Sequence, residues 1–202
     1  MTTSTKERLR AGACADELAT HLDGLEDEAR LSEVRALSGR DLAQLYERCA
    51  GRPAALEELV PETIEAGVPV RHRGINSLPV FRRFEKRFLR SPDGEAELWG
   101  YNEQTMRPLT GPGYFVVPPP GEGEEAGIDY RRVPPRAPDC GWPAVKPNGR
   151  GLARLVYGDM VDTMRRVARG VSIGRAHKGG KPFDAWFALV REPLDCDPET
   201  SR

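Results

Sequence analysis

From residue 68 onward the chain is divided into short apolar runs by glycine and proline, and this division constrains the fold most. Runs of four to eight residues rich in β-branched and aromatic side chains are typical of strands. Six or more such strands at close spacing predict a β-sandwich or a closed barrel rather than a sheet with helical crossovers. The candidate strands are residues 80–90, the segment that contains Trp99 and Tyr101, and residues 113–117, 128–133, 152–157, 171–176 and 183–190.

The clearest pairing joins VSIGRA and FDAWFALV, because the HKGGKP between them contains a Gly-Gly pair. Glycine supplies the positive φ that a tight hairpin turn requires. The run VFRRFEKRFL is ambiguous: in a strand Val80, Phe84 and Phe88 share a face with Arg82 and Lys86, whereas in a helix Phe81, Phe84 and Phe88 do. We expect residues 80–90 and 171–190 to belong to one antiparallel sheet.

The first third of the chain predicts helices. Ser4 and Glu7, and again Ser38 and Asp41, have the spacing of a capping box, and leucines recur at helical intervals after each. The sequence therefore predicts a helical segment over residues 1–65 and an antiparallel β-domain over residues 66–202.

Charge is unevenly distributed along these parts. Residues 1–65 hold 14 acidic and 8 basic side chains, whereas residues 66–91 hold seven basic and one acidic. Both can be solvated faces, or the basic segment attracts an anionic ligand or docks on the acidic one. DLAQLYERCAGRPAALEELV has the outline of a helix-turn-helix, but its acidity disfavours phosphate contacts. We therefore expect no nucleic-acid partner.

The expected setting is cytoplasmic. No apolar run is long enough to span a bilayer, and the first residues, MTTSTKERLR, lack the apolar core of an export signal. We accordingly expect no membrane association and four free thiols, at Cys14, Cys49, Cys140 and Cys196.

Motifs for cofactors and metals are missing. The short glycine motifs at 111–113 and 121–123 lack the strand-to-helix context of a phosphate-binding loop, and the three histidines are widely separated. We predict no cofactor and no metal. The segment 108–147 holds ten of the chain's 18 prolines, and its PPPGEGEEAG (residues 118–127) is a loop by composition. We expect either a lid over a barrel mouth or a plain surface loop here.

The stretch from Leu155 to Gly180, LVYGDMVDTMRRVARGVSIGRAHKGG, carries a family resemblance. VYGDMVDTMRRV, followed by VSIGRAHKGG and the aromatic WFALVRE, resembles the C-terminal half of the GXWXG-type lipocalin-like proteins. EKRF at 85–88 also resembles that family's Gly-Lys-Arg-Phe, with Glu85 in place of glycine. The Gly-x-Trp-x-Gly itself is absent; ERCAG, which keeps only Gly51, stands where it would fall. The resemblance implies a small lipocalin-like barrel and no particular reaction.

The combined hypothesis is a non-enzymatic protein that binds a small apolar, or acidic apolar, ligand inside an antiparallel barrel. Barrels of about eight strands can enclose one small ligand. The candidate pocket residues are Tyr101, Tyr114, Tyr157 and Trp186, with Arg166 as an anchor for a carboxylate. Each aromatic can equally be an ordinary core residue.

Two other functions stay open. One is an enzyme of the same architecture that uses His72 or Asp159 as a base. The other is an interaction protein that recruits a macromolecule through its charged faces. In addition, Arg166 can simply pair with Asp162, four residues away, if that segment is helical.

Overall fold

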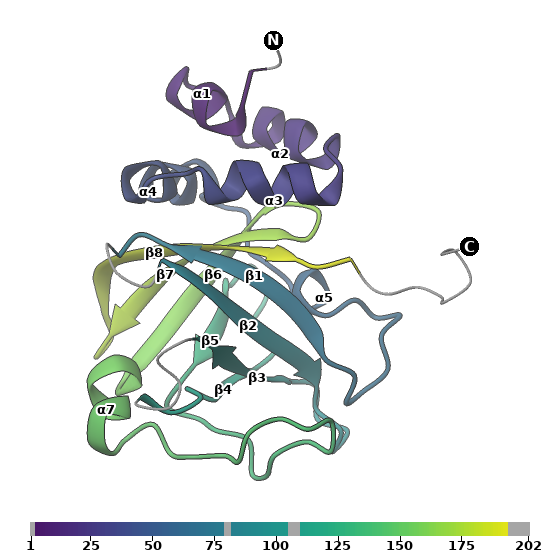
Figure 1. Cartoon of the computed structure of the whole chain (residues 1–202), viewed down its shortest axis with the longest axis vertical. Helices are drawn as coiled ribbons and strands as arrows, with labels where there is room; N and C mark the ends of the chain where they lie inside the picture. The colour runs from purple at the N-terminus through teal and green to yellow at the C-terminus, as the bar shows by residue number, and fades with distance from the viewer. Residues whose placement is uncertain (1–2, 79–81, 105–109, 194–202) are drawn as a thin grey trace.

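The chain folds into a closed antiparallel barrel of eight strands, each paired with its neighbours in sequence and the last with the first (Figure 1). The computed structural model describes residues 3–78, 82–104 and 110–193. The strands are β1 (Val70–Asn76), β2 (Arg83–Arg90), β3 (Leu98–Glu103), β4 (Phe115–Val117), β5 (Ala126–Asp129), β6 (Met160–Ala168), β7 (Val171–Lys178) and β8 (Lys181–Arg191).

The predicted hairpin and the single sheet are confirmed. Strands β7 and β8 pair through a turn at Gly179 and Gly180, whose φ angles are 58° and 75°. The ambiguous run 80–90 is a strand in its described part, and β2 belongs to the same barrel as β7 and β8. Residues 79–81, which include Val80 and Phe81, lie outside the described residues.

Two strand predictions need correction. Residues 152–157 form a helix, α7 (Gly151–Tyr157), rather than a strand. The strand expected over 128–133 is instead β5, which ends at Asp129 because the chain turns away at Tyr130 and Arg131.

Four helices form a layer against one side of the barrel, over strands β6, β7, β8 and β1 (Figure 1). They are α1 (Thr5–Arg10), α2 (Ala15–Asp23), α3 (Asp27–Arg35) and α4 (Gly39–Arg48). Both predicted capping boxes form, at Ser4 and at Ser38. The leucines of the helices pack on outward side chains of the strands such as Ile75, Val167 and Ile173, so this helical layer covers one outer face of the sheet.

A short helix, α5 (Leu56–Leu59), lies at one end of the barrel, away from α7 (Figure 1). Leu56 and Leu59 join inward side chains of the strands, among them Val70, Phe88 and Leu189, in one apolar cluster. This cluster fills the interior at the α5 end, and the opposite end of the barrel remains hollow.

The part of the proline-rich segment that follows β5 packs on the outside of the barrel. Trp142 contacts the outward rings of Tyr101 and Tyr114, and Tyr114 donates a 2.5 Å hydrogen bond from its hydroxyl to the carbonyl of Pro143. Within this segment β4 and β5 are strands of the barrel. Of the two alternatives, the part after β5 matches the surface loop, because it covers an outer face of the sheet.

Among the described residues, no helix has the length and apolarity required to cross a bilayer. Cys14, Cys49 and Cys140 are free thiols, as expected, while Cys196 lies outside the described residues.

Candidate functional site

A cavity of about 400 Å³ occupies the hollow end of the barrel. It lies between the ends of the strands and α7, and its volume falls in the lower part of the range typical of small-molecule sites. Its walls are mainly apolar, formed by Phe84, Tyr157, Met160, Ala176, Trp186 and Phe187.

Glycines in the strands make room for the aromatic rings inside the barrel. A Cβ atom built on Gly174 would lie 2.4 Å from Cζ of Phe187, and one on Gly100 would lie 2.2 Å from Cε2 of Phe115. No side chain fits at such distances, so glycine at these two positions lets each ring lie flat against the neighbouring strand.

Those rings surround the side chain of Lys86, which points into the barrel from β2. Its ammonium lies 5.0–5.1 Å from the ring centroids of Phe115, Tyr130 and Phe187 and 5.6 Å from that of Phe84. Cation–π attraction acts over such distances and strengthens when the site is desolvated. The rings thus compensate part of the cost of burying this charge.

Asp162 of β6 is the counter-ion of Lys86. Its Oδ2 lies 3.7 Å from Lys86 Nζ, and the two side chains are 5% and 3% exposed. Burial raises the pKa of Asp162 to about 6, against the opposing effect of Lys86. Burial also lowers the pKa of Lys86 to about 8, against the opposing effect of Asp162. Between these values the pair is ionised and carries no net charge.

Asn102 and Tyr130 complete this polar cluster below the cavity. Lys86 Nζ donates to Asn102 Oδ1 at 2.8 Å and to the Tyr130 hydroxyl. Asn102 Nδ2 donates to the Gly113 carbonyl at 3.0 Å and to the Tyr130 hydroxyl at 3.3 Å. Asn102 and Asp162 line the cavity, so these two side chains form its polar floor.

Helix α7 shapes the rim. It places Tyr157 over the barrel, where the hydroxyl accepts a 2.6 Å hydrogen bond from Gln104 Nε2, and burial raises the pKa of Tyr157 to about 12. Leu155 on α7 and Phe183 on β8 also line the rim, and they are 71% and 49% exposed. The entrance is therefore unusually apolar for solvent-facing surface.

The structure places the five predicted pocket residues at different sites. Tyr157 lines the cavity. Trp186 also borders it, but its ring lies against Arg175 and the helical layer on the outer face of the strands. Tyr101 and Tyr114 do not line it: both point outward from β3 and from the residue before β4 and are buried against Trp142. They are core residues of the outer cluster, which is the alternative that the sequence left open for them.

The position predicted for Arg166 needs correction. Alternation along β6 points Asp162 and Met164 inward and reaches Arg166 only at the α5 end of the barrel. There its guanidinium pairs with Glu58 at 3.1 Å and is 46% exposed. Arg166 is thus neither an anchor in the cavity nor the partner of Asp162.

The candidate catalytic bases lie away from the cavity. His72 is buried at the α5 end, where its Nε2 donates to the Leu59 carbonyl at 2.8 Å and burial lowers its pKa to about 4. Asp159 is exposed beyond α7 with a φ of 54°. The two residues do not meet in one site, and neither lines the cavity.

Sequence reasoning missed the central role of Lys86, Asn102 and Tyr130. The signal for Lys86 was present, since it shares the inward face of the β2 run with Phe84 and Phe88. A lysine between two inward-facing aromatic residues indicates a buried cation. Asn102 follows in the same way from Trp99 and Tyr101, whose outward positions leave it facing inward.

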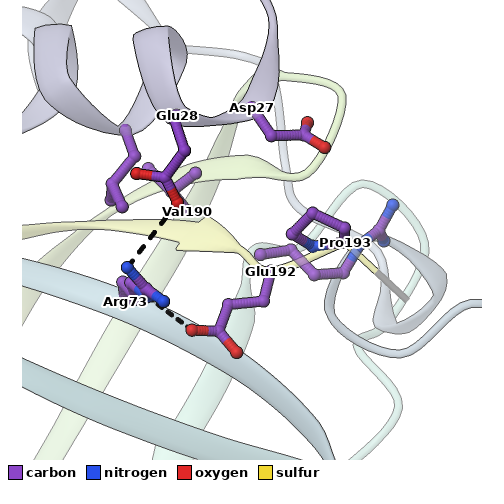
Figure 2. Close-up of a pocket in the computed structure, with 8 residues that line it drawn as sticks. Asp27, Glu28, Arg73, Val190, Glu192 and Pro193 are labelled. Atoms are coloured by element: carbon purple, nitrogen blue, oxygen red, sulfur yellow. Dashed lines mark hydrogen bonds and ion pairs between the residues drawn. The ribbon is translucent and has the colours of Figure 1, made fainter. Parts of the chain in front are cut away.

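A second, smaller pocket of about 170 Å³ lies between α3 and the β1–β8 pair (Figure 2). Here Arg73 lies between Glu28, 3.8 Å away, and Glu192, with which it forms a closer ion pair. The basic segment thus contacts the acidic helical layer at this point. Its charges are already paired and largely solvated, so this pocket is a weaker candidate than the barrel mouth.

Among residues 3–78, 82–104 and 110–193, no group of three His, Cys, Asp or Glu side chains is placed to hold a metal ion. Comparison of the chain with protein-family models, with curated proteins and with solved structures gives no match. The cavity and its floor are therefore the observations from which a function must be argued.

Proposed function

We propose that this protein binds a small, mainly apolar molecule in the mouth of its barrel. The observation that carries the proposal is the combination of an apolar cavity of about 400 Å³ with a buried polar floor. Binding sites for small molecules have this composition, with apolar walls for affinity and a few polar groups for orientation. We assign no reaction to this site, and the proposal includes no nucleic-acid partner, no membrane association and no cofactor.

The exposed apolar rim supports the same proposal. Leu155 and Phe183 stand at the entrance, where they offer an apolar ligand a continuous path from solvent to the cavity. The rim has no evident role in stability, because exposed side chains contribute little to the core. The lipocalin-like character of the barrel and its cytoplasmic location also remain proposals.

The proposal is tested by titration with N-phenyl-1-naphthylamine, an uncharged apolar fluorophore. We expect saturable binding to one site, with increased fluorescence in the apolar cavity. Ala176 lines the cavity and pairs with Asp162 across β6 and β7. In Ala176→Leu the added methyl groups occupy the cavity, so we expect affinity to fall by about tenfold or more, equivalent to about 1.4 kcal/mol.

The matched control is Ala144→Leu, the same enlargement at an exposed alanine of the proline-rich loop. We expect this variant to bind the fluorophore like the wild type. Absence of saturable binding, or equal effects of the two substitutions, would count against the barrel mouth as a binding site.

A further inference from the structure

The hydrogen-bond donors below the cavity are already used. An ammonium has three donors, and those of Lys86 face Asn102 Oδ1, the Tyr130 hydroxyl and Asp162 Oδ2. The two amide donors of Asn102 go to Gly113 and Tyr130. The Tyr130 hydroxyl in turn donates to Asn102 Oδ1 at 3.4 Å. A ligand that needs donors, such as a carboxylate, finds none of these three side chains free.

An acceptor, in contrast, is left open. Asp162 Oδ1 is buried and has no hydrogen-bond partner within the part of the chain that the structure describes. Asp162 lines the cavity, and its side chain is only 5% exposed. A buried carboxylate oxygen without a donor is costly, and a donor on a ligand would remove that cost.

Charge selects further among possible donors. The ionised pair of Asp162 and Lys86 is neutral as a whole, so an ammonium on the ligand would add an uncompensated buried charge near Lys86. A carboxylate on the ligand would add a negative charge beside Asp162. A neutral donor adds no charge and meets the open oxygen with a charge-assisted hydrogen bond.

We propose that the ligand class of this cavity is an uncharged apolar molecule with a hydroxyl group, such as a long-chain alcohol or a phenol, whose hydroxyl donates to Asp162. This inference rests on the proposed function, and it replaces the acidic ligand that an inward Arg166 would have favoured. Lys86 acts on the ligand indirectly, as the positioning residue that keeps Asp162 ionised.

The test ranks four head groups on similar chains by displacement of N-phenyl-1-naphthylamine at pH 7. The competitors are 1-octanol, methyl heptyl ether, octanoate and octylamine. Octanol and the ether have the same number of heavy atoms, and only octanol has a donor. We expect octanol to bind at least about tenfold more tightly than the ether, as hydrogen bonds to charged groups allow. Octanoate and octylamine should both bind more weakly than octanol.

Asp162→Asn then changes the floor with little change in volume. Lys86 requires an acceptor, so the amide should turn its oxygen toward Lys86 and its NH₂ toward the cavity. Because an NH₂ donates equally to an alcohol and an ether, we expect the preference for octanol to fall to about threefold or less. Asp129→Asn is the matched control: Asp129 is also buried but pairs with Arg131 outside the cavity, so this variant should keep the wild-type preference.

The outcomes separate the two proposals. If the fluorophore does not bind, the proposed function fails. If it binds but octanol and the ether compete equally, or octanoate or octylamine competes best, the hydroxyl proposal fails alone. An unchanged octanol preference in folded Asp162→Asn also overturns it. The ranking in the wild type decides the matter even if that variant does not fold.

Discussion

The buried pair of Lys86 and Asp162 allows the most demanding prediction about stability. Both side chains are almost fully buried, and Asp162 is the one carboxylate that forms an ion pair with Lys86 within the described part of the chain. Removing one partner of such a pair leaves the other as an uncompensated charge, which typically costs about 3–5 kcal/mol. We expect Lys86→Met and Asp162→Leu each to lower the free energy of unfolding by about this amount at pH 7.

The double variant should behave differently. When both charges are removed, Asn102 and Tyr130 still bond to each other, and Asn102 still donates to the Gly113 carbonyl. Replacement of a whole buried ion pair by apolar side chains is often neutral or stabilising. We therefore expect the double variant to be within about 2 kcal/mol of the wild type, far less destabilised than the sum of the two single variants.

The pH dependence of Lys86→Met has a definite sign. Without Lys86, the pKa of Asp162 should rise beyond its wild-type value of about 6, because the main influence that lowers it is gone. A group whose pKa is higher in the folded state stabilises the fold as pH falls through that pKa. The destabilisation of Lys86→Met should thus be smaller at pH 5 than at pH 7. Asp162→Leu should show the opposite trend, since lowering the pKa of Lys86 favours the fold as pH rises.

The assay is urea unfolding of the wild type, both single variants and the double variant at pH 5, 7 and 9. Additive effects, or single variants that cost less than about 1 kcal/mol at every pH, would refute the account of a charged pair compensated within the barrel.

Two further predictions concern the barrel interior. Gly174→Ala should cost about 1–3 kcal/mol in urea unfolding, because the new Cβ meets the ring of Phe187, whereas Gly127→Ala, with its nearest contact at an ordinary 3.4 Å, should cost clearly less. Burial lowers the pKa of His72 to about 4, so a titration of its imidazole ¹⁵N shifts should find the ring neutral down to about pH 5. The neutral ring should carry its proton on Nε2, which donates to the Leu59 carbonyl. A transition near pH 6.5 would contradict the burial of His72.

The architecture was predictable from the sequence to a considerable extent, because the relevant signals are local. Gly179 and Gly180 specify a tight turn by their positive φ angles. Alternation of side chains around Phe115 predicts which residues of that strand face into the barrel and which face out. Ser4 and Ser38 mark the starts of two helices.

The strand expected at 152–157 was wrong for a physical reason. Leu152, Leu155 and Val156 are apolar, as in a buried strand, but in the structure they are exposed on α7 beside the cavity. Composition cannot tell a short buried strand from a short helix that is apolar at a binding-site rim.

The candidate site was predicted only in part because it depends on pairings far apart in the sequence. Tyr157 and Trp186 could be proposed from local sequence patterns. Whether an inward side chain reaches the cavity or lies at the α5 end, however, depends on its position along the barrel axis. Asp162 and Arg166 differ only in this respect, at four residues' separation on β6. The partnership of Lys86 and Asp162 requires closure of the barrel, which no single segment specifies.

The most direct measurement of the central claim is a set of isotope-filtered nuclear Overhauser effects between bound N-phenyl-1-naphthylamine and ¹³C-labelled protein. The account predicts cross-peaks from the fluorophore to the methyl groups of Met160 and Ala176 and to the ring of Phe187, all of which line the cavity. Cross-peaks confined to the helical layer, for instance to Leu22 or Leu45 in the apolar cluster between helices and sheet, would contradict it.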